Sequence, residues 1–157
     1  MVFNVWKHIS YKEATYSSTA KQLGLDNKPK KEHLENMELL AEKVFEPLRE
    51  WVGGPIKVNS FYRAEEVNAR IGGASLTSDH ILGKAIDITS MGKKTNKEMF
   101  DYIIENLDFD QVISEYPVNG EPSWIHVSYK SKKDNRKQAL EIKRKGKYYT
   151  YTGCKTC

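Results

Sequence analysis

Two histidines and one aspartate are the residues of this chain whose types and spacing best suit chemistry. His80 and Asp87 lie seven positions apart around Gly83, and His126 lies later, inside an apolar strand-like run. Imidazole nitrogen and carboxylate oxygen are ligands that Zn²⁺ takes in proteins, and three such ligands leave the fourth tetrahedral position open. An open position is typical of zinc sites that hydrolyse bonds rather than hold a fold together. The three residues therefore indicate a zinc-dependent hydrolase.

The spacing of His80 and Asp87 requires a turn between them. Seven residues of regular strand are too long to bring both side chains to one ion. The two can meet if His80 lies on a loop and the chain reverses at Gly83, which tolerates a positive φ. An equally good interpretation of this segment alone is a loop histidine hydrogen-bonded to a strand aspartate. His126 favours the metal site because it completes a ligand set.

A hydrolase of this kind also needs a general base, and Glu115 is the first residue to consider. If the chain forms a hairpin about Asn119-Gly120, position 113 lies opposite His126 and Glu115 lies opposite Trp124. Glu115 then shares a face with His126, on a diagonal of about 7–8 Å between backbones. A slip of one residue would turn Glu115 to the other face. Glu121, in the turn itself, is the alternative base.

Arg63 is a candidate for binding substrate, because its planar fork matches a carboxylate. The alternative is a structural ion pair with Glu65, Glu66 or another acid. In the same hairpin register, Gln111 and Ser128 would share the face of Glu115 and could position water or an amide. We assign no role to them from the sequence.

The elements that must position these residues predict an α+β protein. Apolar residues spaced by three and four predict a long helix over 31–51, in which Pro47 removes one amide donor and favours a kink. Gly53 and Gly54 are expected to end it. Shorter helices are expected at 64–71 and 97–107, and strands at 56–61, 85–89, 109–116, 123–129, 139–143 and 148–151.

The size and charge of the chain limit its class. Its 157 residues predict one domain over 1–153, and we expect 154–157, with Cys154 and Cys157, to be a short tail. The net charge of +4 is too small and scattered to argue for nucleic-acid binding. No apolar run approaches a membrane span. We expect a monomer without a secretion signal, which either works in the cytoplasm or reaches its substrate by another route.

Four segments, in chain order, resemble motifs of the D-alanyl-D-alanine carboxypeptidase-like zinc peptidases. Segment 59–74 is similar to the family's SGYR…VN…GG stretch, and 78–87 resembles its SxHxxGxAxD signature. Segment 110–115 resembles the FDQ…E strand of a branch common in phage and gut-bacterial genomes. Segment 124–129 resembles the closing WxHVSY strand. The similarity extends over about residues 10–139.

The resemblance implies a hedgehog-like α+β fold, with N-terminal helices packed on a mostly antiparallel sheet. It implies one Zn²⁺ bound by His80, Asp87 and His126. The implied reaction is hydrolysis of peptide bonds next to D-amino acids in peptidoglycan stem peptides. Two alternatives remain open: an endopeptidase cutting L-Ala–D-Glu or a cross-bridge, as in phage endolysins, and a non-catalytic zinc-stabilised module of cell-wall binding or virion structure.

The chain departs from the family pattern at two positions. Ser123 stands where several branches carry the acid that acts as base, so Glu115 becomes the expected base. Arg63 is expected to hold a substrate carboxylate or carbonyl oxygen, and Ser78 to support the loop of His80 and border the substrate. Phe61 replaces the usual glycine and is expected to narrow the cleft near Arg63.

Overall fold

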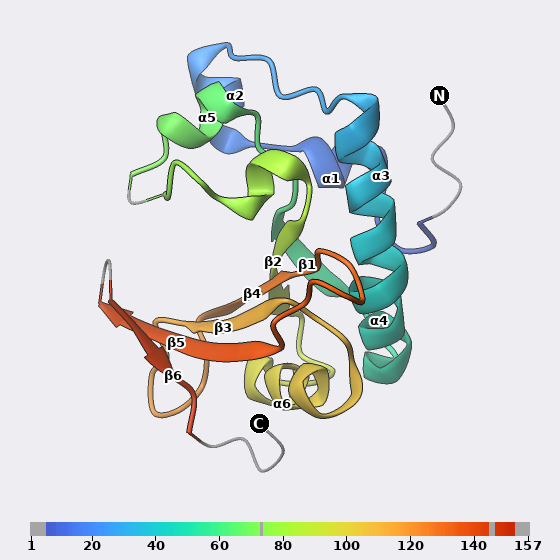
Figure 1. Cartoon of the computed structure of the whole chain (residues 1–157), viewed down its shortest axis with the longest axis vertical. Helices are drawn as coiled ribbons and strands as arrows, with labels where there is room; N and C mark the ends of the chain where they lie inside the picture. Colours follow the sequence, from blue (N-terminus) through green and yellow to red (C-terminus); the bar gives the residue numbers. More distant parts are fainter. Residues whose placement is uncertain (1–5, 73, 145–146, 153–157) are drawn as a thin grey trace.

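Six strands form one sheet in the order β1-β2-β4-β3-β5-β6 (Figure 1). This computed structural model describes residues 6–72, 74–144 and 147–152. All neighbouring strands are antiparallel except β3 and β5, which run parallel. The predicted α+β class with a mostly antiparallel sheet is confirmed. The strands are β1 Ile56–Ser60, β2 Ala85–Ser90, β3 Gln111–Glu115, β4 Trp124–Ser128, β5 Gln138–Arg144 and β6 Lys147–Thr150.

The first five helical elements precede β1, two more lie between β1 and β2, and α6 lies between β2 and β3. Two of them begin at capping boxes, Ser10 with Glu13 and Thr95 with Glu98, which satisfy backbone donors of the first turn. No helix in the described part of the chain is long and apolar enough to cross a membrane. The helical elements are α1 Tyr11–Thr15, α2 Ser18–Leu23, α3 Lys31–Leu40, the π-helical η1 Ala41–Phe45, α4 Glu46–Val52, α5 Glu65–Ala69, the 3₁₀ turn η2 Asp79–Leu82 and α6 Asn96–Asn106.

Pro47 is accommodated by a π-helical turn within the predicted long helix. Proline has no N–H, and its ring meets the carbonyl four residues earlier in a regular α-helix. The helix widens over η1 immediately before Pro47, where the Glu46 N–H donates to the carbonyl of Ala41, five residues back. The chain therefore continues as helix to Val52, and Gly53 ends it in the left-handed conformation with φ 69°.

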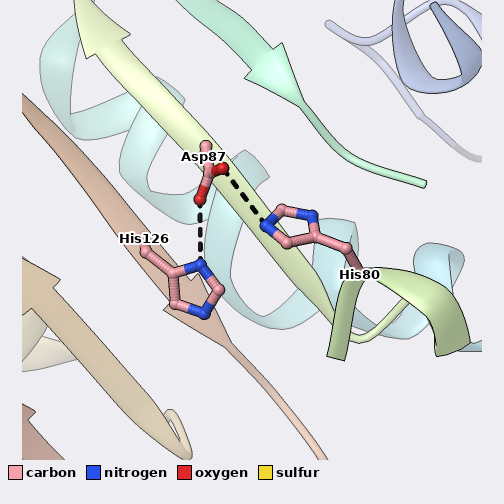
Figure 2. A group of neighbouring side chains, drawn as sticks. All are labelled: His80, Asp87 and His126. Atoms are coloured by element: carbon pink, nitrogen blue, oxygen red, sulfur yellow. Dashed lines mark hydrogen bonds and ion pairs between the residues drawn. The ribbon is translucent and has the colours of Figure 1, made fainter. Parts of the chain in front are cut away.

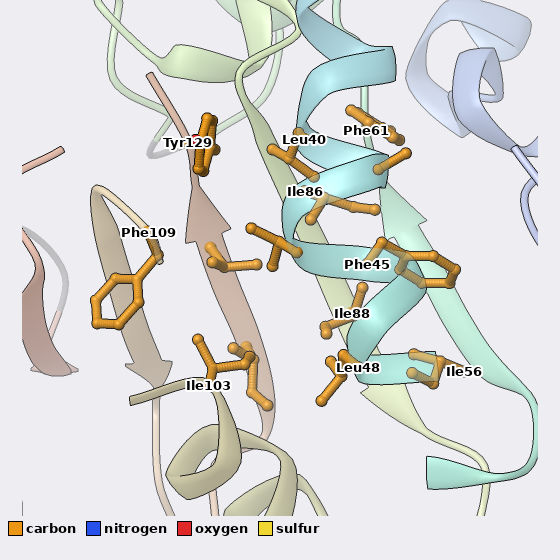
Figure 3. Close-up of a cluster of buried hydrophobic side chains, with 14 of the residues drawn as sticks. Leu40, Phe45, Leu48, Ile56, Phe61, Ile86, Ile88, Ile103, Phe109 and Tyr129 are labelled. Atoms are coloured by element: carbon orange, nitrogen blue, oxygen red, sulfur yellow. The ribbon is translucent and has the colours of Figure 1, made fainter. Parts of the chain in front are cut away.

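The hydrophobic core lies between one face of the sheet and the helices α3, α4 and α6 (Figure 3). Because successive strand residues point to opposite faces, Ile86 and Ile88 enter this core while Asp87 points away from it. In β4, Ile125 and Val127 are buried in the same way on either side of His126. The opposite face of the sheet is therefore left to carry polar groups.

A buried carboxylate fastens the connection between β4 and β5 to the start of β3. Asp110 is fully buried and accepts hydrogen bonds from Arg136 N at 2.9 Å, Nε at 3.0 Å and Nη2 at 2.7 Å. Lys130 Nζ lies 3.5 Å from the same carboxylate. Burial alone would raise the pKa of Asp110, but the hydrogen bonds and charge of Arg136 outweigh it and hold the pKa below its usual range.

Replacing Asp110 by Asn should lower the free energy of unfolding by about 2 kcal/mol at neutral pH, because three hydrogen bonds to a charged acceptor are weakened. Because the pKa of Asp110 is lower in the folded than in the unfolded state, its ionised carboxylate stabilises the protein at pH values above the unfolded pKa of about 3.9. This stabilisation is lost as the pH falls through the pKa of the folded state. Urea unfolding at a series of pH values measures both effects.

The control for that measurement is Asp134→Asn, the same change at an exposed aspartate that accepts a bond from Ser131. It should change the free energy of unfolding by less than about 0.5 kcal/mol. Equal effects of the two substitutions, or an Asp110→Asn effect that stays constant down to pH 3, would contradict this account of Asp110.

Candidate metal centre

The pairing of β2 with β4 places Asp87 directly opposite His126 (Figure 2). Both side chains point to the face of the sheet away from the core, since their neighbours along each strand are buried in it. Side chains at directly opposite positions lie about 5 Å apart at Cβ, which is close enough to share a ligand. The sheet register thus supplies two of the three predicted ligands.

The third ligand comes from η2, the short 3₁₀ turn before β2. Ser78 caps this turn by accepting the His80 N–H, and Gly83 ends it with φ 71°. A Cβ at Gly83 would fall 2.6 Å from the carbonyl oxygen of His33 and 2.7 Å from Cγ of Met37 in α3. Gly83 is therefore required both for its backbone conformation and for the close approach to α3. The predicted reversal at this glycine is confirmed.

The carboxylate of Asp87 lies between the two imidazole rings (Figure 2). Its Oδ1 accepts a hydrogen bond from His126 Nδ1 at 2.9 Å, and its Oδ2 lies 3.2 Å from His80 Nε2. One ligand atom from each of the three residues falls within 4.8 Å of the others. The site is secluded, since the side chains of His80, Asp87 and His126 are 1%, 16% and 15% exposed.

The hydrogen bonding of His80 shows that this group suits a cation. His80 Nδ1 lies 2.7 Å from the carbonyl of Phe61, and because a carbonyl only accepts, Nδ1 must carry the proton. In the neutral ring, Nε2 is then a bare lone pair that faces the Asp87 carboxylate and has no hydrogen-bond partner in the described structure. Two acceptors held this close are stabilised by a positive ion between them.

The separations also fit Zn²⁺. Bonds of about 2.1 Å in a tetrahedral site separate the ligand atoms by about 3.4 Å. The observed 2.9 Å and 3.2 Å are close to that spacing. A histidine that binds metal usually donates its other N–H to a carbonyl or carboxylate, which is what His80 does with Phe61. The residues present therefore fit a zinc ion held by His80, Asp87 and His126.

Charge states in the site follow from the central carboxylate. Burial alone would raise the pKa of Asp87, but the attraction of His80 and the bond from His126 hold it well below its usual range. Burial lowers the pKa of His80, which favours the neutral ring. For His126, burial is outweighed by the bond to Asp87, and the pKa is raised. Ionised aspartate and neutral histidine are the forms that bind metal, so His126 Nδ1 would give up the proton that it donates to Asp87 when an ion binds.

The triad opens into a cleft of about 910 Å³ whose lining includes Glu115 but not Glu121. β3 pairs with β4 in the predicted register, with Ile113 opposite His126 and Glu115 opposite Trp124. Glu121 instead accepts a hydrogen bond from Lys97 N at 3.0 Å, in the first turn of α6. The structure therefore places Glu115, and not Glu121, beside the metal ligands.

The environment of Glu115 is that of a carboxyl group able to exchange protons. Burial raises the pKa of Glu115 to about 7, with a further upward contribution from Asp87 and an opposing one from His126. A carboxyl group with a pKa near neutrality can accept and return a proton at physiological pH. Tyr116, the next residue, adopts a left-handed conformation with φ 46° and ends β3 at this point.

Arg63 lies at the rim of the triad. Its backbone N–H donates to the carbonyl of His80 at 3.1 Å, and its Nη2 lies 3.5 Å from Ser78 Oγ. Burial lowers the pKa of Arg63, against the attraction of Asp87. Its Nε is buried without a hydrogen-bond partner, and no salt bridge of Arg63 occurs within residues 6–72, 74–144 and 147–152. The alternative pairing with Glu65 or Glu66 is thus not observed.

Three other sequence-based expectations have different outcomes. The expectation that Phe61 narrows the cleft is wrong, because its ring is fully buried in the core and stacks on Trp6. Ser123 donates to the carbonyl of Tyr116 at 2.7 Å and closes the hairpin outside the cleft. Gln111 lines the cleft as predicted, whereas Ser128 is buried and accepts the Gln111 N–H.

The cleft extends farther than the sequence indicated. Its lining includes Leu140 and Ile142 of β5 and Tyr148 and Thr150 of β6. These residues face the cleft because β5 pairs in parallel with β3, with Ile113 opposite Leu140 and Glu115 opposite Ile142. The sequence predicts a strand over 139–143, but no local signal pairs it with β3. Cys154 and Cys157 lie outside the described residues.

The family comparison agrees with this geometry. Residues 7–128 match the model of the Peptidase M15 family, and the chain belongs to that family of zinc-dependent, D-Ala-D-Ala carboxypeptidase-like peptidases. The match spans every predicted ligand and ends before β5. A search among curated proteins finds no match to the chain. The family supports a metallopeptidase and implies a peptidoglycan substrate.

We expect the protein to bind one Zn²⁺ per chain, and Asp87→Asn to weaken binding by more than about 100-fold, since the substitution removes the charge shared by both rings. Zinc should raise the melting temperature of the wild-type protein, because ligand binding to the folded state stabilises it. Competition with a chelator and thermal unfolding provide the two readouts.

Asp79→Asn is the matched control, because Asp79 lines the same cleft outside the group of ligand atoms. This variant should bind zinc as the wild type does. Wild-type affinity in Asp87→Asn would show that the ion does not lie between the two histidines.

Proposed function

We propose that this protein is a zinc-dependent peptidase that hydrolyses peptide bonds next to D-amino acids in peptidoglycan stem peptides, as a D-Ala-D-Ala carboxypeptidase does. The observation that supports it most is one cleft containing both the His-Asp-His group and Glu115, whose burial raises its pKa to about 7. A metal site alone would suit a structural role. A proton-exchanging carboxyl group beside it favours hydrolysis.

When bound by His80, Asp87 and His126, Zn²⁺ supplies Lewis-acid chemistry, which polarises a carbonyl and lowers the pKa of water. Glu115, in its ionised form, accepts the proton of the attacking water. The protonated carboxyl then donates this proton to the leaving amine, which restores the carboxylate. Burial raises the pKa of Glu115 to about 7 in the metal-free site, so this carboxyl group is not held permanently ionised by its surroundings.

Arg63 is proposed to bind the free carboxylate at the C-terminus of the substrate. Its guanidinium lines the cleft beside His80 and Ser78 and has an unpartnered Nε. A planar guanidinium can form two parallel bonds to a carboxylate. Ser78, which caps η2 and lies near Nη2, holds both Arg63 and the loop of His80 in place. A terminal carboxylate next to the scissile bond is the feature that a carboxypeptidase must recognise.

Glu115→Gln should lower kcat by about 10²–10⁴-fold while zinc content stays near one per chain, because the amide cannot accept the proton. Zinc content and the rate of amine release from purified peptidoglycan are measured on the same sample. Glu121→Gln is the control: the side chain caps α6 away from the cleft, so activity should persist.

Product masses from a digest of stem peptides identify the bond. Loss of a terminal D-Ala supports the proposed carboxypeptidase, whereas cleavage at L-Ala–D-Glu or in a cross-bridge identifies an endopeptidase of the phage endolysin type. A zinc-loaded wild-type protein that releases no amine would contradict the enzymatic proposal and favour a cell-wall-binding or virion module.

A further inference from the structure

The open face of the sheet forms a continuous floor from the metal ligands to β6. Residues that pair directly across neighbouring strands form one row from β2 to β6. The row consists of Asp87, His126, Ile113, Leu140 and Thr150. All five line the same cleft. The second half of this row, on β5 and β6, lies beyond residue 128, where the family match ends. The β5–β6 ribbon, defined as residues 138–144 and 147–150, thus lies outside the region that the family model matches.

The floor is apolar where it leaves the metal ligands. Ile113, Leu140 and Ile142 form a hydrophobic cluster of their own, separate from the main core. Gln111 and Gln138 border this cluster on one side, with their side-chain amides joined at 2.6 Å. The three apolar side chains are already buried, at 6%, 8% and 5% exposed, so a peptide on this face would meet mainly the residues around them.

Tyr148 stands at the far end of this floor. It lies opposite Ile142, which in turn lies opposite Glu115, so its ring is on the cleft face of β6. The residue is 54% exposed. Tyr148 therefore offers apolar surface that a ligand can bury, whereas Ile142 beneath it is already covered.

We propose that the β5–β6 ribbon is a substrate subsite, in which Tyr148 contacts the peptide segment on the N-terminal side of the scissile bond. The inference rests on the proposed function, since Arg63 takes the terminal carboxylate beside η2 and leaves the rest of the peptide to run across β3 and β5. From β4 to β6 the floor spans three strand spacings, about 14 Å. That length accommodates about four residues of extended peptide.

The test compares Tyr148→Ala with Tyr149→Ala. Both residues are exposed tyrosines of β6, but Tyr149 lies on the other face, where Lys143 Nζ sits 5.9 Å from its ring centroid. The substrates are N-acetyl-D-Ala-D-Ala and a sugar-free stem pentapeptide ending in D-Ala-D-Ala. Released D-Ala gives KM and kcat for each peptide, and thermal unfolding checks that both variants fold.

Tyr148→Ala should raise KM for the pentapeptide about tenfold and leave kcat and the dipeptide KM within about twofold. Tyr148→Phe, which keeps the ring, should retain the wild-type KM, and Tyr149→Ala should behave as the wild type. Equal effects of Tyr148→Ala on both peptides, or on neither, would overturn the subsite while leaving the proposed function intact. Failure of the wild-type protein to release D-Ala from either peptide would overturn the proposed function, and this subsite with it.

Discussion

The carboxylate of Asp87 between two imidazole rings is the interaction on which the rest of the site depends. It fixes the charge of both histidines and leaves a lone pair of His80 facing a carboxylate oxygen 3.2 Å away. A buried arrangement of this kind is unfavourable without a cation. The surrounding structure holds it in place: Gly83 is packed against α3, Phe61 holds the His80 ring through its carbonyl, and the β2–β4 register fixes His126.

The sheet carries this geometry outward from the metal ligands. Because each strand alternates between its two faces, the residues that build the core and those that line the cleft are interleaved in β2, β3 and β4. When Ile86 and Ile88 are buried in the core, Asp87 between them must face the cleft. In the same way, burial of Val112 turns its neighbour Ile113 to the cleft, on the same side as Glu115. Stability and the placement of the site thus have one cause, and a one-residue slip would destroy both.

Much of this was predictable from the sequence because the signals are local. The Asn119-Gly120 turn set the β3–β4 register and so placed Glu115, and a glycine between His80 and Asp87 indicated the reversal. Three features depend on long-range contacts and were not predictable. No local sequence pattern predicts the parallel pairing of β5 with β3, so the part of the cleft lined by β5 and β6 was not predicted. Phe61 is buried in the core, where it stacks on Trp6 from a distant part of the chain, and Glu121 bonds to the distant N-terminus of α6.

The most direct test of the central claim is anomalous diffraction at the zinc edge from crystals of the zinc-loaded protein. The account predicts one strong peak at about 2.0–2.2 Å from His80 Nε2, a carboxylate oxygen of Asp87 and His126 Nδ1, on the side of the cleft that contains Glu115. A peak bound by other residues, or none in crystals that contain zinc, would contradict it.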